Sequence, residues 1–187
     1  MVLEKYFKNY RPFLLFLLKF LGCYVILILF YQMYLNQFDP KVFETDGFTS
    51  LVASQTKTIL LALGFNVELI PHLSEPSMRV LINGKAIVRI VEGCNAISIM
   101  ILFVSFIISF SGKFWQTITF VFLGLLLIHV LNVFRIVLLT IGLLYHKKYE
   151  HLMHDIIFPL FIYGVVFGLW ILWVNKFSKN VKKSVTE

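Results

Sequence analysis

Charged residues are scarce in this sequence, and the basic ones do not gather in one patch. Only 14% of the 187 residues are Asp, Glu, Lys or Arg, whereas soluble domains carry roughly 25%. The net charge of +7 could suggest a nucleic-acid partner, but many of the lysines and arginines flank apolar runs at the two ends of the chain. We interpret them as signals of membrane topology and expect no nucleic-acid partner.

Cysteine is also rare, with two residues in the chain. Two cysteines are too few for a disulfide framework. Cys23 lies within the first apolar run and Cys94 at the edge of the second, so the two thiols would sit at different depths in a membrane. We therefore expect both cysteines to be free.

Long apolar runs dominate what remains: 59% of the residues are hydrophobic, and 20 are Phe. This composition indicates an α-helical integral membrane protein. A bilayer crossing takes roughly 17–25 residues, and four runs approach or exceed this length, although the second is short. The chain is therefore expected to have about four transmembrane helices, at about 13–34, 95–110, 114–144 and 156–174.

The only sizeable segment outside the membrane is predicted at residues 36–92. Residues 50–63 predict a helix, capped by Thr49 or Ser50 and stopped by Gly64. The β-rich stretches 79–82 and 86–91 flank Asn83-Gly84, a dipeptide that suits a type I′ hairpin turn, and residues 67–70 are compatible with a further strand. The segment is thus a small extracytoplasmic α/β unit whose hairpin leads directly to Cys94.

The distribution of lysine and arginine gives the expected orientation. Four spans put both termini on one side, and both termini are basic, so the positive-inside rule puts them in the cytoplasm. We expect a multi-pass protein of the inner (cytoplasmic) membrane with its candidate site facing the extracytoplasmic side. The predicted parts are a cytoplasmic N-terminus (1–12), a transmembrane anchor (13–35), the extracytoplasmic segment (36–92), a membrane bundle with the candidate catalytic residues (93–175) and a basic cytoplasmic tail (176–187).

Polar side chains from three segments fall at the predicted outer boundary of the spans. Cys94 directly precedes the second span, and His154 precedes the last. Arg135 lies about 20 residues, or about 30 Å, into the third run. It shares one helix face with His129 and Asn132 at spacings i, i+3 and i+6. A charged residue within such a run usually faces the inside of a bundle and marks function.

A thiol, a guanidinium and an imidazole together form a complete set for acyl transfer. His154 could accept the proton of Cys94, and Arg135 could stabilise the oxyanion of the transition state. Glu92 and Asn132 are supporting residues that could orient Arg135. Three of these residues also have a purely structural interpretation. Cys94 could be a buried thiol, Arg135 could reach the lipid headgroups, and Asn132 could pack helices together.

The loop before the last span also admits a metal site. His151, His154 and Asp155 lie close together in the sequence, but the His-Glu-x-x-His pattern of helical metalloproteases is absent. We therefore favour a thiol mechanism, which requires no cofactor and no metal, over a metal-dependent hydrolase.

Three short stretches carry the candidate residues: Val91-Glu92-Gly93-Cys94-Asn95-Ala96-Ile97, Asn132-Val133-Phe134-Arg135-Ile136 and His154-Asp155. Together they resemble the exosortase/archaeosortase family, over about residues 88–165. The chain has Ala96 where the Cys box of the family commonly has Gly, and its length resembles the short, F-type exosortase subtype.

The resemblance implies a membrane cysteine protease/transpeptidase that cleaves C-terminal sorting signals of exported proteins at the outer face of the membrane. Such a signal comprises a recognition motif, a transmembrane helix and a basic tail, so the implied partners are these substrates and the membrane lipids. The Cys, Arg and His of the family map onto Cys94, Arg135 and His154, with His151 as the alternative base. The other class of function consistent with the sequence is a non-enzymatic membrane scaffold of an export or surface-assembly system.

Overall fold

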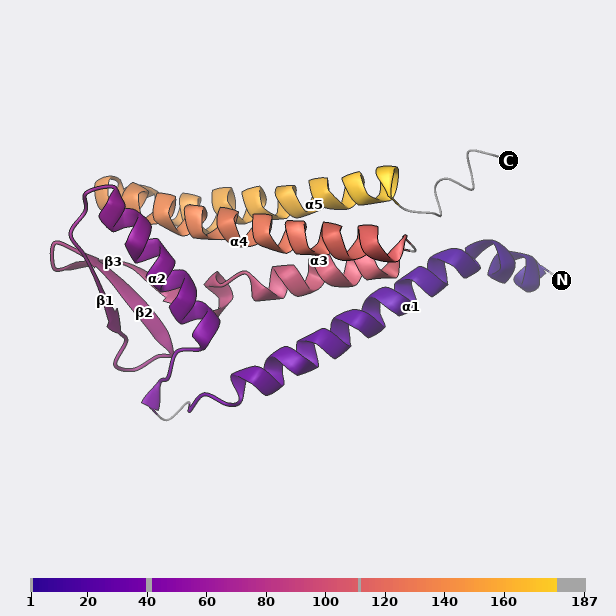
Figure 1. The fold of residues 1–187 in the computed structure, drawn as a ribbon, viewed down its shortest axis with the longest axis horizontal. Coiled ribbons are helices and arrows are strands. Elements are labelled where there is room, and N and C mark those ends of the chain that lie inside the picture. The colour runs from indigo at the N-terminus through magenta and orange to yellow at the C-terminus, as the bar shows by residue number, and fades with distance from the viewer. Residues whose placement is uncertain (1, 40–41, 111, 178–187) are drawn as a thin grey trace.

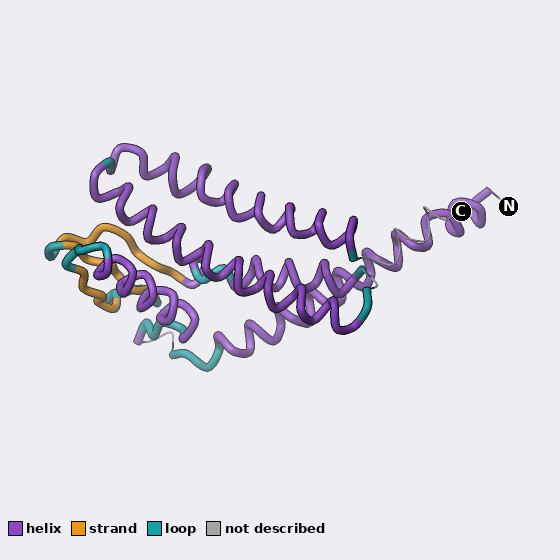
Figure 2. Tube along the Cα trace, turned by 45° about the horizontal axis from the view of Figure 1, so that its top comes forward, coloured by secondary structure: helices purple, strands orange, loops and turns teal. Residues whose placement is uncertain are grey.

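The molecule consists of a bundle of long helices with a small α/β unit at one end (Figure 1). The computed structural model describes residues 2–39, 42–110 and 112–177, without the side chains of residues 2–9. Figure 2 shows the strands gathered at one end of the helices, opposite the N-terminal end of α1 and the C-terminal end of α5. The helices are α1 (Val2–Leu35), α2 (Gly47–Ala62), α3 (Ile97–Ser109), α4 (Phe114–Tyr145) and α5 (Phe158–Lys176).

Three helical segments in the described part of the chain are long and apolar enough to cross a membrane. They are Tyr10–Leu35 of α1, the whole of α4, and Leu152–Lys176, in which the π-helical turn η4 (Leu152–Ile157) continues into α5. The structure thus confirms the helical membrane class. Where four spans were predicted, it gives three candidate spans and one shorter apolar helix.

That shorter helix is α3, which replaces the span predicted at 95–110. It has 13 residues, about 20 Å of helix, against a hydrocarbon core of about 30 Å. The helix begins late because the side chain of Asn95 accepts a hydrogen bond from Ile97 N at 2.9 Å, outside the helix. Its neighbours are α1, α4 and α5.

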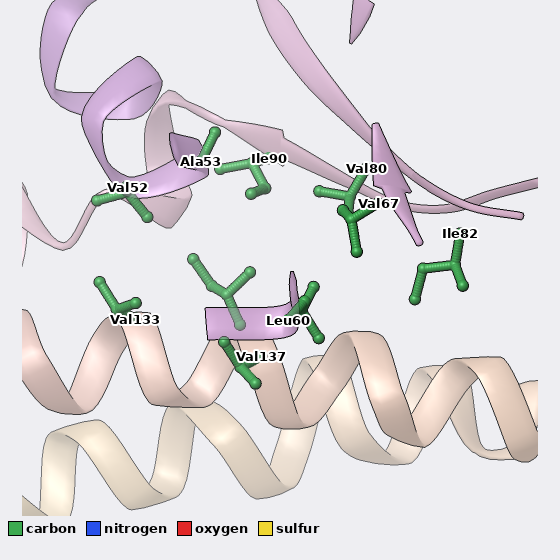
Figure 3. Packing of buried hydrophobic residues seen from close by; sticks show 10 residues of the cluster. Val52, Ala53, Leu60, Val67, Val80, Ile82, Ile90, Val133 and Val137 are labelled. Atoms are coloured by element: carbon green, nitrogen blue, oxygen red, sulfur yellow. The ribbon is translucent and has the colours of Figure 1, made fainter. Parts of the chain in front are cut away.

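α4 is longer than a bilayer is thick. Its 32 residues extend about 48 Å. Val133 and Val137, in its C-terminal half, belong to the same buried cluster as Leu60 of α2 and Val80 of the sheet (Figure 3). The C-terminal part of α4 therefore packs against the α/β unit.

The sheet has three antiparallel strands in the order β1-β2-β3. Asn83 and Gly84 have φ of 51° and 75°, so the predicted type I′ hairpin is confirmed. The stretch at 67–70 is also a strand. The bounds are β1 (Val67–Pro71), β2 (Ser77–Ile82) and β3 (Lys85–Val91).

The N-cap of α2 differs from the prediction of Thr49 or Ser50. Asp46 caps the helix, because its carboxylate accepts a hydrogen bond from Thr49 N at 3.0 Å. Thr49 is buried within the first turn. Gly64, with φ of 87°, follows the end of the helix as predicted.

Candidate active site

Cys94 lies on a short 3-10 turn, η2 (Glu92–Cys94), that joins β3 to α3. The next residue, Asn95, is buried. Its Nδ2 donates to the hydroxyls of Tyr31 at 3.0 Å and Thr49 at 3.2 Å, so the turn is tied to α1 and to α2. Cys94 itself is half-buried, and the thiols of Cys94 and Cys23 are both free, as predicted.

The backbone at Ala96 explains why glycine suits this position of the Cys box. Its φ is 63°, in the left-handed region that costs an L-residue roughly 1–2 kcal/mol and costs glycine almost nothing. The glycine that is common at this position in the family that the sequence resembles would adopt this backbone conformation without strain. Alanine preserves the same turn here at a conformational cost.

Asn132 connects the thiol turn to the helix that carries Arg135. Its Nδ2 donates to Cys94 O at 2.7 Å, and its Oδ1 lies 3.5 Å from the Arg135 Nη1 donor. Asn132 is fully buried, and Arg135 is half-buried with an Nε that finds no acceptor among the described residues. The structure thus brings together Cys94, Asn132 and Arg135, three residues that the sequence singled out.

Glu92 is exposed at the start of η2. It forms no ion pair with Arg135 in the described part of the structure, so orientation of the guanidinium comes from Asn132 instead. Both residues were predicted as supporting residues, and only Asn132 makes the predicted kind of contact.

His154 lies nearer than Arg135 to the C-terminal end of α4. Met153, next to it, packs on Gly142 of α4 so closely that a Cβ at Gly142 would overlap its side chain. Gly142 is seven residues beyond Arg135, which is about 10 Å along the helix. The expectation of one common depth therefore fails for His154, because the contact that sets its level joins two helices and leaves no local signal.

His154 is exposed and shares its partner with His151. Its Nδ1 lies 2.7 Å from Asp155 Oδ1, while His151 Nε2 lies 3.5 Å from Asp155 Oδ2. Among the described residues, no group of three or more His, Cys, Asp or Glu side chains could hold a metal ion. The shorter contact favours His154 as the imidazole that Asp155 orients.

A pocket of about 810 Å³ lies beyond Arg135, toward the C-terminal end of α4. Its lining comprises four consecutive residues of β3, Arg79 of β2, His72, Leu139 and Leu143 of α4, and residues of the 148–155 segment that include His154. Leu139 is one turn beyond Arg135 on the same face of α4. His154 therefore lines the pocket, and Arg135 lies one turn of α4 away from the lining residue Leu139.

Sequence reasoning missed the polar contacts that hold the site from the side. Tyr31 and Thr49 accept hydrogen bonds from Asn95. Gln55 Oε1 lies 2.8 Å from Nε2 of His129, which precedes Asn132 by about one turn of α4. The position of Asn95 beside Cys94 was the one signal available. Partners 46 and 64 residues away along the chain leave no pattern in a single sequence.

Fold and site together define a helical membrane protein in which Asn132 links the backbone of the Cys94 turn to Arg135 on the same helix as Asn132. A family model described as transmembrane exosortase matches residues 11–176. The chain therefore belongs to the transmembrane exosortase family, and the match extends well beyond the 88–165 stretch that carried the resemblance. Neither the curated proteins nor the solved structures give a significant match.

Proposed function

We propose that this protein is a membrane cysteine protease/transpeptidase that cleaves C-terminal sorting signals of exported proteins on the outer face of the cytoplasmic membrane. Family membership supports the class of activity. The hydrogen bond from Asn132 Nδ2 to Cys94 O carries the assignment of the site, because it couples the thiol turn to the arginine helix.

Cys94 is the nucleophile. Its thiolate attacks the carbonyl carbon of the scissile peptide, and the carbonyl oxygen becomes an oxyanion that accepts hydrogen bonds from Arg135. The intermediate collapses when the C–N bond breaks and the leaving amine takes a proton. The remaining thioester is then attacked by water or by an acceptor amine, which releases Cys94.

His154 is the base in this scheme. The bond of its Nδ1 to Asp155 holds the tautomer whose Nε2 can accept the thiol proton and return it to the leaving amine. Since His154 lies about two turns outward of Arg135, the proposal includes an inward shift of η4 when substrate fills the pocket. Single π-helical turns are frequent at functional sites, and lid closure is a common step in catalysis.

The test compares the two cysteines of the chain. Cys94→Ala is expected to abolish C-terminal processing of exported proteins, whereas the matched Cys23→Ala variant processes normally. Arg135→Gln is expected to slow processing about 10²–10³-fold, the usual effect of removing an oxyanion donor. Processing is followed by mass spectrometry of the C-terminal peptides of exported proteins, and membrane insertion of every variant by fractionation.

Complete processing by correctly inserted Cys94→Ala would remove the thiol mechanism. It would leave the non-enzymatic scaffold as the function of this member of the family.

A further inference from the structure

β3, the strand that leads into the Cys94 turn, lies at an edge of the sheet. Since the strand order is β1-β2-β3, β2 pairs with one side of β3. No strand of the described chain pairs with the other side. Edge strands present unpaired N–H and C=O groups, and many proteins bind an extended peptide there as an added strand.

The pocket follows this free edge. Four consecutive residues, Ala86, Ile87, Val88 and Arg89, contribute to its wall. Arg79 of β2, which pairs with Arg89, and His72, which follows β1, also line the pocket, so the pocket extends from the edge of β3 over one face of the sheet. Its volume of about 810 Å³ is within the range of about 300–1,000 Å³ usual for ligand sites.

A β-bulge interrupts β3 at Ile87. Val88 pairs with Val80, but Ala86 pairs with Leu81, so Ile87 has no partner on β2. Ile87 packs instead against the buried residues of α4. Bulges disrupt pairing locally and occur beside active sites. The regular part of β3 that an added strand can follow is therefore 88–91, the part next to Cys94.

Arg79 supplies a donor without an acceptor. It lines the pocket and lies directly across from Arg89 in the sheet, although like charges in this arrangement repel. Arg89 forms an ion pair with Glu75, whereas the buried Arg79 Nε has no hydrogen-bond partner among the described residues. Arg79 also lines the pocket, so the other N–H groups of its guanidinium can donate to an oxygen of a bound molecule.

The distance from the pocket to the thiol fits a peptide. From Val88 to Val91 the strand advances about 10 Å at 3.3 Å per residue. η2 adds about 6 Å at 2.0 Å per residue. An extended chain covers this total of about 16 Å with about five residues.

We propose that an extended segment of the substrate binds as a fourth strand on the free edge of β3, with one of its oxygens accepting a hydrogen bond from Arg79. The scissile carbonyl, about five residues farther along, then reaches Cys94. The pocket lies outward of Arg135, so the docked segment is on the side of the scissile bond away from the substrate's membrane helix. This inference rests on the proposed function, and it specifies how the substrate is recognised.

The test is disulfide cross-linking in membranes that contain the full-length chain. Cys23→Ala and Cys94→Ala remove the native thiols, and one cysteine is added as Arg89→Cys. Ile70→Cys is the matched control, since Ile70 pairs with Arg79 from the opposite edge of the sheet, at the level of Arg89. The probe is the exported protein whose processing is lost in Cys94→Ala cells, carrying one cysteine at successive positions outside its membrane helix.

Cross-links to residue 89 are expected from alternate probe positions, centred about five residues from the cleavage point, and cross-links to residue 70 are expected to be absent. Equal cross-linking at both residues, or none at residue 89, overturns strand addition while the proposed function stands. If Cys94→Ala cells still process every exported protein, the proposed function is overturned and the strand inference with it.

A second measurement addresses the hydrogen bond from Arg79. With the same probe and the purified full-length protein bearing Cys94, Arg79→Gln is expected to raise KM about tenfold or more with kcat unchanged, and Arg79→Lys to recover part of the loss. A fall in kcat with KM unchanged would show that Arg79 does not bind the segment.

Discussion

At the scale of single residues, the candidate site has one fixed half and one loose half. The Cys94 turn is bound through its carbonyl oxygen to the buried Asn132 at 2.7 Å, and the neighbouring Asn95 is bound on both sides. The side chain of His154, in contrast, is 49% exposed, and that of His151 is 84% exposed. Buried contacts thus hold the Cys94 turn and Asn132 in place, whereas the two histidines lie on an exposed segment.

This division predicts that the two histidines differ. His154→Ala is expected to lower the single-turnover rate of processing about 10²–10⁴-fold, the usual value of a general base, because Asp155 holds His154 at 2.7 Å. His151, at 3.5 Å from the same carboxylate, is the matched control, and His151→Ala is expected to keep most of the rate. The measurement is a quenched time course with excess enzyme. The opposite order would transfer the role of base to His151 and leave the thiol mechanism intact.

At the scale of elements, the close contact between α3 and α4 depends on a glycine. A Cβ on Gly124 of α4 would overlap the ring of Phe103, which is fully buried in α3. The short α3 presents a ring of this size to α4 only because Gly124 leaves room for it. This contact fixes α3, and therefore the Cys94 turn that precedes it, against α4.

Gly124→Ala is accordingly expected to destabilise the protein. Alanine favours a helix by up to about 1 kcal/mol over glycine, but overpacking a core costs about 1–3 kcal/mol, so the net effect is a loss. Gly164→Ala on α5 is the control, since nothing lies within 4 Å of its would-be Cβ. Thermal unfolding in detergent should show a lower midpoint for the first variant and an equal or higher one for the second. Equal midpoints would mean that α3 and α4 are not packed this tightly.

The elements also show which features a single sequence can reveal. The hairpin was predictable because Asn83-Gly84 encodes two positive φ angles locally, and the long apolar runs were equally plain. The start of α3 at Ile97 was not, because the hydrogen bond from Ile97 N to the side chain of Asn95 leaves the apolar pattern of the run unchanged. The level of His154 was hidden for a different reason: it depends on Met153 meeting Gly142, a tertiary contact.

At the scale of the whole molecule, the two ends differ in character. The α/β unit and the 147–155 segment lie at one end, whereas the N-terminal end of α1, the 112–113 connection and the C-terminal end of α5 lie at the other (Figures 1 and 2). The basic termini of the sequence predict that this second end faces the cytoplasm. The candidate site would then open to the extracytoplasmic side.

Cysteine labelling of intact cells tests this orientation. In a chain without Cys23 and Cys94, Leu73→Cys, at a position 85% exposed in the α/β unit, is expected to react with a membrane-impermeant maleimide. Lys113→Cys, at an exposed position of the opposite end, should react only after the cells are permeabilised. Labelling of residue 113 alone in intact cells would reverse the proposed orientation.

The length of α4 has one more consequence. Under the proposed function, a helix of about 48 Å in a hydrocarbon layer of about 30 Å would hold Cys94 at a fixed height, whereas the membrane helix of a substrate would adjust its position to the lipids around it. Bilayer thickness would then determine which peptide bond is cut, because longer acyl chains would shift the substrate's helix relative to α4 and bring a different bond to the thiol.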